Sequence, residues 1–449
     1  MKTQKTRICL IGLGPSGIGF LWKYLQDGLD PSEILCIEAG PRLAYRNCPV
    51  LDYKECNYKK VCHITSGFGG SSVMAGGKVS LYPAGSGLTN ILDDSAYIER
   101  KIKESAQVYE QNLQLKRHVN LPEMHEQAKS YYNGLGYEFK YYDAALYSQK
   151  DFFNVNQKFE EDFIRAGIEI RFNTMVTDIE IHDGRYIVHI FNKSNLEVLS
   201  CEKVILATGK SGHNLADKLS KKFGVESRAE KAEIGVRVEF PISAFPDIDK
   251  FHYDLKLKSG NCKTFCVSKG GKIALYYSDN LLYTEGYDDY KNPTSFTNLG
   301  ILYKLDAENH DITTIIEDII LKRKNNGLIK PIRQTYFDFL NSIESNEFNY
   351  ESSIKSWEKG DINEFLPNQI SHRLRDEVKS FVSSFVHKDY RSRTSIFFPE
   401  MNYQKTSFKL AEDFQCLPNF YVIGEITGKF IGILQSFASG MICAETYKK

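Results

Sequence analysis

Apolar and polar residues follow a regular pattern at the start of the chain. Residues 8–11 and 34–37 are short, continuous apolar runs, which are typical of strands buried in a parallel sheet. Between the two runs, apolar side chains recur at the spacing of one helical face: Ile18, Leu21, Trp22 and Leu25. The pattern predicts a β-α-β unit over residues 8–38.

The pattern then changes several times along the chain. Residues 93–165 are mostly polar with helical spacing, and we interpret them as an insertion with connecting helices. Residues 177–200 alternate with a period of two around short turns, which predicts a three-stranded antiparallel meander. A further buried strand is expected at residues 204–207.

A different pattern begins in the middle of the chain. Strands with alternating aromatic and polar residues come first, and helical segments follow over residues 311–385. Residues 420–423 return to a continuous apolar run, which suits a strand that completes the first sheet. We therefore predict a discontinuous first domain with a second domain inserted into it: residues 1–225 and 391–449, and residues 226–390.

Length, charge and cysteine content argue against several classes of protein. The 449 residues are too many for one compact core and predict about two to three domains. Lys and Arg total 57, as do Asp and Glu, so we expect neither a nucleic-acid nor a membrane partner. Ten cysteines are too few for a disulfide scaffold, which predicts free thiols and a cytoplasmic protein. Glycines and a proline interrupt the apolar residues 8–22, so we do not interpret them as a secretory signal. Glycines, serines and charged residues interrupt residues 420–444, so we do not interpret them as a membrane span.

The first candidate site is the turn between the first strand and the first helix. Gly12 permits a tight turn, Gly14 lets the backbone approach a diphosphate, and Gly17 lets helix and strand pack closely. Glu38 ends the second strand, where an acidic residue is expected to accept hydrogen bonds from a ribose hydroxyl. Because strand, helix and acid all fall in place, the sequence predicts a bound dinucleotide.

Three further segments favour FAD over NAD as that dinucleotide. A glycine-rich stretch, residues 67–72, follows soon after the second strand. Residues 207–209 end a later strand, and residues 424–425 precede a glycine-rich helix start. A nicotinamide enzyme instead usually continues with further β-α units.

Together these motifs resemble the two-dinucleotide-binding-domain flavoprotein superfamily. Within it, the chain is similar to the bacterial FAD-dependent dehydrogenase (NAD(FAD)-utilising dehydrogenase-like) family over nearly its whole length. The resemblance continues through three later motifs: residues 234–241, 264–266 and 393–395. It implies an α/β fold in which a Rossmann-like FAD-binding domain, with a parallel sheet and an antiparallel meander, carries an inserted α+β substrate domain.

The resemblance also implies which residues bind FAD. The diphosphate would lie on the first turn and the adenosine ribose on the end of the second strand: Gly12, Gly14, Pro15, Ser16, Gly17, Glu38 and Ala39. The backbone of Val176 would meet the adenine. The flavin and its ribityl chain would contact the remaining segments: Gly69, Gly70, Ser71, Ser72, Ala207, Thr208, Gly209, Gly424 and Glu425. The helix that begins at Gly432 and Ile433 would point at the flavin N1/C2 carbonyl region, where its dipole stabilises negative charge.

Three basic residues are candidates for catalysis, each with a structural alternative. Lys78 suits a hydrogen bond to the flavin pyrimidine edge or a substrate anion, or else a surface position. Arg237 shares one strand face with Glu239, which suits a substrate pocket or an ion pair between domains. Arg393 suits a substrate carboxylate clamp or a structural ion pair. His252 and Tyr277 are candidate proton donors, with structural roles as the alternative.

The cysteines do not form a metal-binding pattern. Cys48, Cys56 and Cys62 precede the glycine-rich stretch without a C-x2-C pair, and Cys262 and Cys266 lack one too. We therefore expect no metal and interpret these residues as reduced cysteines. The alternative is a redox-active thiol near the flavin.

The combined interpretation is an FAD-dependent oxidoreductase. It would exchange a hydride or electron pair between flavin N5 and a small organic substrate, by reduction or dehydrogenation of a C–C or C–N bond. The alternatives are a flavin oxidase or monooxygenase that uses O2, and a non-catalytic flavin-binding regulatory protein. Residues 226–390 carry no second nucleotide fingerprint, so NAD(P)H or a protein electron donor would bind only transiently.

Overall fold

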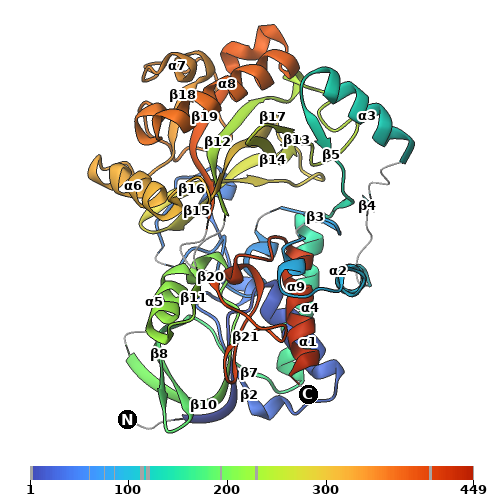
Figure 1. The fold of residues 1–449 in the computed structure, drawn as a ribbon, viewed down its shortest axis with the longest axis vertical. Helices are drawn as coiled ribbons and strands as arrows, with labels where there is room; N and C mark the ends of the chain where they lie inside the picture. Colours follow the sequence, from blue (N-terminus) through green and yellow to red (C-terminus); the bar gives the residue numbers. More distant parts are fainter. Residues whose placement is uncertain are drawn as a thin grey trace.

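The computed structural model describes residues 4–59, 61–74, 76–84, 86–111, 116–117, 122–192, 195–227, 231–403 and 407–447. Figure 1 shows a lower lobe, which contains both the first and the last helix, and an upper lobe. The upper lobe is formed by strands and helices from the middle of the chain.

Parallel strands form the centre of the lower-lobe sheet, in the order β22–β10–β1–β2–β7. Their bounds are Phe420–Val422, Asn195–Leu206, Gln4–Ile11, Ile34–Ile37 and Glu169–Arg171. Both apolar runs of the predicted β-α-β unit are buried in this sheet, and so are all three residues of β22. The parallel order around β1 is Rossmann-like and confirms the predicted fold class.

The predicted meander is present, but its third strand is longer than expected. Strands β8 (Thr174–His182) and β9 (Arg185–Asn192) pair antiparallel, and β9 pairs with β10. The sequence suggested that the third meander strand and the buried strand at residues 204–207 were separate. They are one strand, because β10 pairs with β9 along one edge and with β1 along the other.

Helices from both ends of the chain cover the lower-lobe sheet. The predicted amphipathic helix is α1 (Pro15–Gln26), and it packs directly against the last helix, α9 (Ile433–Thr446). Figure 1 shows α9 in red beside α1. The other helices of this lobe are α2 (Ser95–Glu110), α4 (Gln149–Arg165) and α5 (His213–Phe223). Among the described residues, no helix combines the length and apolar character needed to cross a bilayer.

The upper lobe is built on an antiparallel sheet in the order β18–β19–β12–β17–β14–β13–β5. The bounds are Ile332–Thr335, Ser395–Asn402, Lys231–Pro241, Phe296–Asp306, Cys262–Lys269, Lys256–Ser259 and Glu138–Lys140. Strands β15 (Lys272–Ser278) and β16 (Leu281–Tyr287) form a hairpin beside it. The helices are α3 (Pro122–Gly134), α6 (Ile312–Asn325), α7 (Tyr336–Asn341) and α8 (Asn368–Phe385).

The upper-lobe sheet contains strands from outside the predicted insertion, residues 226–390. Strand β5 precedes residue 226 and β19 follows residue 390, yet both pair within the upper-lobe sheet. The chain therefore crosses between the lobes more often than a single insertion requires. A small sheet that includes β3 (Lys78–Ser80) and β6 (Ala144–Leu146) lies where these crossings occur.

Candidate functional site

A pocket of about 940 Å³ lies at the carboxyl ends of the parallel strands. Its wall includes Gly12 after β1, Glu38 after β2 and Ala207 after β10. In open α/β sheets, ligands bind in the crevice outside these strand ends. The volume is in the range of cofactor and small-molecule sites.

The turn between β1 and α1 can be made only with glycine. Gly12 has a φ of +99°, and a Cβ there would lie 2.5 Å from the carbonyl oxygen of Ala207. A Cβ on Gly17 would lie 2.1 Å from the carbonyl oxygen of Gly12. Helix α1 begins at Pro15, and no side chain caps its first turn. Its first N–H groups and its positive dipole end are therefore available to an anionic ligand in the pocket.

The carboxylate of Glu38 ties three loops together around this turn. It accepts backbone N–H bonds from Leu13 at 2.7 Å, Gly40 at 2.9 Å and Gly67 at 2.8 Å. Glu38 is buried and still forms part of the pocket wall. A carboxylate offers about four acceptor positions, so these bonds leave room for the ribose hydroxyl that the sequence predicts. Glu38 thus has a structural role that the sequence pattern did not reveal.

Arg46 is a residue near the pocket that sequence reasoning missed. Its buried guanidinium donates to the carbonyl oxygens of Phe68 and Gly70, both at 2.7 Å, and of His63 at 2.6 Å. Burial lowers the pKa of Arg46 to about 10. These bonds hold the glycine-rich stretch against the pocket. No local pattern marks Arg46, because its partners are carbonyl groups that any residue carries.

Most of the residues predicted to bind FAD line this one pocket. They are Gly12, Gly14, Pro15, Ser16, Glu38, Ala39, Gly70, Ser71, Ser72, Val176, Ala207, Thr208, Gly209, Glu425, Gly432 and Ile433. The remaining three, Gly17, Gly69 and Gly424, do not line it. Gly69 donates to the carbonyl of Leu13, and Gly424 donates to Oγ of Ser439.

The start of α9 forms another part of the wall. Gly432 precedes the helix with a φ of +129°, and no side chain caps the first turn. Gly432, Ile433 and Ser436 all face the pocket. Two helix N-termini, those of α1 and α9, therefore meet at the same pocket. Their combined dipoles favour a ligand with negative charge in two places.

None of the three candidate catalytic residues lines the pocket. Lys78 is partly buried and pairs with Asp254, its Nζ lying 3.0 Å from Oδ1. Arg393 is exposed. Of the two candidate proton donors, Tyr277 lines the pocket, whereas His252 is fully buried elsewhere. His252 lies 2.7 Å from the carbonyl oxygen of Tyr142 and accepts from the N–H of Asp254. Burial lowers the pKa of His252.

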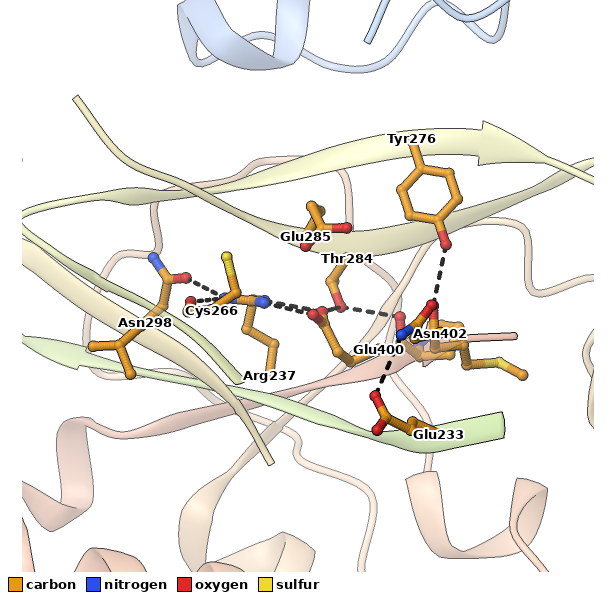
Figure 2. Close-up of polar contacts among 12 residues, drawn as sticks. Glu233, Arg237, Cys266, Tyr276, Thr284, Glu285, Asn298, Glu400 and Asn402 are labelled. Carbon is orange, nitrogen blue, oxygen red and sulfur yellow. Dashed lines mark hydrogen bonds and ion pairs between the residues drawn. The ribbon is translucent and has the colours of Figure 1, made fainter. Parts of the chain in front are cut away.

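Arg237 lies inside the upper-lobe sheet and does not pair with Glu239. Its Nε donates to Glu400 at 2.9 Å, and a second donor completes a bidentate pair with the same carboxylate (Figure 2). Nη1 donates to Oδ1 of Asn298 at 2.7 Å, and Thr284 donates to Glu400 at 2.7 Å. Glu239 instead accepts from Ser353. Arg237 therefore forms a structural ion pair, but with Glu400 inside one sheet and not with Glu239 between domains.

The cysteines are free thiols, and one of them reaches the pocket. Cys62 lines the wall, and its sulfur accepts from the backbone N–H of Tyr277 at 3.4 Å. Burial raises the pKa of Cys48 to about 11 and also raises the pKa of Cys56. Within the described ranges, no group of three or more His, Cys, Asp or Glu residues is arranged to hold a metal ion.

Lys210 is a second residue that sequence reasoning missed. Its Nζ lies 3.2 Å from Oε2 of Glu285 and 3.7 Å from Oε1 of Glu425. Lys210 and Glu425 line the pocket. Burial opposes the charge of Lys210, but the two carboxylates hold its pKa well above the usual value. Lys210 directly follows the strand-end motif at residues 207–209. Glu285 is distant in sequence, so no spacing pattern connects them.

No family model matches the chain. An uncharacterized protein of Clostridium beijerinckii is 21% identical over 270 residues, covering 57% of this chain and 46% of that protein. The chain therefore matches less than half the length of this relative.

Solved structures with a similar arrangement include two oxidoreductases and a reductase-like protein. A flavoprotein/dehydrogenase from Cytophaga hutchinsonii is 10% identical with a TM-score of 0.42, covering 99% of this chain and 79% of the other. A geranylgeranyl bacteriochlorophyll reductase-like protein from Thermoplasma acidophilum has the same identity of 10% and TM-score of 0.42, covering 100% and 79%. The p-nitrophenol 4-monooxygenase PnpA of Pseudomonas putida is 10% identical with a TM-score of 0.40, covering 99% and 78%. Likeness at this level assigns no reaction or ligand to this chain.

Proposed function

We propose that this protein is an FAD-dependent oxidoreductase related to the bacterial FAD-dependent dehydrogenase-like family. One observation carries the proposal. The β1–α1 turn, Glu38, the glycine-rich stretch and the start of α9 converge on a single pocket, which side chains of the upper lobe help to line. These segments are far apart in sequence, and a dinucleotide long enough to touch all of them explains why they meet.

The residues around the pocket fit FAD. Gly14 faces Gly70 across the pocket wall, and a Cβ on Gly70 would lie 2.8 Å from Cα of Gly14. Two backbones that approach this closely leave a narrow cradle without side chains, which suits a diphosphate. The uncapped start of α1 supplies N–H donors there. At the other end, the uncapped start of α9 suits a flavin ring that gains negative charge.

When bound, FAD would supply the hydride and electron transfer itself. The chain's own residues would bind and orient it. Glu38 would accept a hydrogen bond from the adenosine ribose while it holds the three loops around the turn. The backbone of Val176 would meet the adenine, and Arg46 would keep the glycine-rich stretch in position beside the ring.

The substrate would be a small organic molecule held beside the upper lobe. Tyr58, Cys62, Tyr277 and Asn280 contribute side chains to the wall on that side. Tyr58 and Tyr277 pack edge to face, with ring centroids 5.9 Å apart, which suits a compact organic substrate better than a polyanion. The strands of the upper-lobe sheet pair antiparallel throughout the part of the chain that the structure describes. A stably bound nicotinamide would instead call for a second β-α-β unit, so any NAD(P)H would act transiently.

The test is spectroscopic. The purified protein, reconstituted with FAD if necessary, is expected to be yellow and to bleach anaerobically with one of three reductants: NADH, NADPH or a pool of metabolites. Bleaching by a metabolite alone supports substrate dehydrogenation, whereas fast reoxidation in air supports an oxidase or monooxygenase. A bound flavin that no physiological reductant bleaches would point to a regulatory protein. Protein that stays colourless with added FAD would refute the proposal.

A further inference from the structure

Three charged side chains from three separate segments meet at the end of the pocket that faces the upper lobe. Lys210 lies in the turn Lys210–Gly212 after β10, Glu425 lies in the turn Gly424–Thr427 before α9, and Glu285 lies on β16. Lys210 lies between the two carboxylates, at 3.2 Å and 3.7 Å. It therefore links both lobes through one ammonium group.

Lys210 also lies between two cavities. It lines the large pocket and a second, small cavity of about 20 Å³, which has room for roughly one water molecule. The small cavity is lined largely by aromatic side chains, among them Tyr276, Tyr283 and Tyr403. The ammonium of Lys210 lies 5.3 Å from the ring centroid of Tyr276. With 21% of its side chain exposed, Lys210 is mostly removed from solvent, so its charge, together with those of Glu285 and Glu425, acts on whatever occupies the pocket.

The charges continue from Lys210 into the upper lobe. Burial opposes the charge of Glu285, but Lys210 and then Arg237 interact with its carboxylate and hold its pKa below the usual value. Arg237 in turn forms the buried bidentate pair with Glu400 seen in Figure 2. The order from the sheet interior to the pocket is thus Glu400, Arg237, Glu285, Lys210 and Glu425. The row holds three carboxylates and two cations, so removing Lys210 makes the charge beside the pocket more negative by one, and removing the charge of Glu285 makes it more positive by one.

We propose that Lys210 is the electrostatic positioning residue of the cofactor site, which orients Glu425 and whose positive charge stabilises the reduced flavin. This inference rests on the proposed function. When FAD takes up two electrons and only one proton, the cofactor becomes more negative by one charge. Relative to a neutral side chain at this position, the ammonium of Lys210 stabilises that form over the oxidised one and so raises the reduction potential, whereas Glu285 and Glu425 act in the opposite sense.

The experiment measures the midpoint potential of the bound flavin by dithionite titration against a reference dye. Lys210→Met is expected to lower the preference for reduced over oxidised FAD at least tenfold, which is a shift of about 30 mV to more negative potential for a two-electron couple. Glu285→Gln removes a negative charge and is expected to shift the potential in the opposite direction. Lys210→Arg keeps the charge and is expected to remain within about threefold of the unmodified protein, or about 14 mV.

The matched control is Lys203→Met, because Lys203 lies over the ring of Tyr447 and outside the pocket wall. It is expected to leave the potential unchanged. Opposite shifts from Lys210→Met and Glu285→Gln support the inference. If Lys210→Met does not retain flavin, the sign of the Glu285→Gln shift decides the outcome. A Glu285→Gln shift that is absent or negative overturns the inference, as does a Lys210→Arg shift as large as that of Lys210→Met. Unmodified protein that binds no flavin contradicts the proposed function itself.

Discussion

The two sides of the pocket are built in different ways. On the side of the parallel strands, the wall consists largely of backbone groups and glycines, held by the hydrogen bonds of Glu38 and Arg46. On the side of the upper lobe, charged side chains such as Lys210 and Glu285 meet across the junction. Substitutions that add side-chain volume should disturb the first side, and substitutions that remove a charge should disturb the second. Substitutions can test whether this distinction holds.

The largest effect is expected inside the upper lobe. Arg237→Met leaves the carboxylate of Glu400 buried without its bidentate partner, which costs about 3–5 kcal/mol of unfolding free energy. Urea denaturation measures the loss. Arg393→Met serves as the control, because Arg393 is exposed and its removal should change stability by no more than about 0.5 kcal/mol. If the double variant Arg237→Met/Glu400→Gln is no more stable than Arg237→Met, the unpaired charge is not the cause.

The next effect tests the glycine side. Gly12→Ala places a Cβ 2.5 Å from the carbonyl oxygen of Ala207, so the turn must shift. We expect FAD binding to weaken at least about 100-fold, or about 2.8 kcal/mol, in a flavin titration. Gly134→Ala is the matched control, because nothing lies within 4 Å of a Cβ there. Equal affinities of the two variants would mean that volume at the turn does not matter.

A smaller effect is expected at Glu38, whose carboxylate holds together the side of the pocket that is built from backbone groups. Glu38→Gln keeps the shape but replaces one acceptor oxygen by an NH2 group, which leaves at least one of the three N–H donors unsatisfied. The cost should be about 1–3 kcal/mol of unfolding free energy. Glu33→Gln removes a surface partner of Arg7 and should cost less than about 1 kcal/mol. Similar losses in both variants would show that the three loops do not depend on Glu38.

The smallest effect concerns pH at the junction of the lobes. Burial raises the pKa of Asp288 from 3.8 to about 6, and its carbonyl oxygen accepts from the N–H of Gly77. The folded state therefore binds this proton more tightly than the unfolded state does. Stability from this group falls as pH rises from about 4 to 6.

Asp288→Asn removes that dependence. The unfolding free energy of the variant relative to the unmodified protein should rise by about 2 kcal/mol between pH 4 and pH 7. Denaturant titrations at several pH values measure the difference. A difference that stays flat, or that falls as pH rises, would show that Asp288 is not held in its neutral form by burial.

Local patterns in the sequence were enough to predict the Rossmann-like core. The apolar runs that became β1 and β2, the helical spacing from Ile18 to Leu25, and the glycines of the turn are encoded within a short stretch of chain. The spacing of apolar residues, the geometry of the turn and the position of Glu38 depend on residues close by in the sequence. They can therefore be recognised without any knowledge of the rest of the molecule.

Only the tertiary structure decided which charged residues meet. Arg237 and Glu400 are paired because β12 and β19 lie side by side, and Lys210 and Glu285 because the turn after β10 meets β16. Arg46 binds carbonyl groups, which every residue carries, so its partners leave no mark in the sequence. The residue types of Lys78 and Arg393 suggested a role in catalysis, but neither residue lines the pocket. Charge interactions act through space, and the sequence alone does not specify those distances.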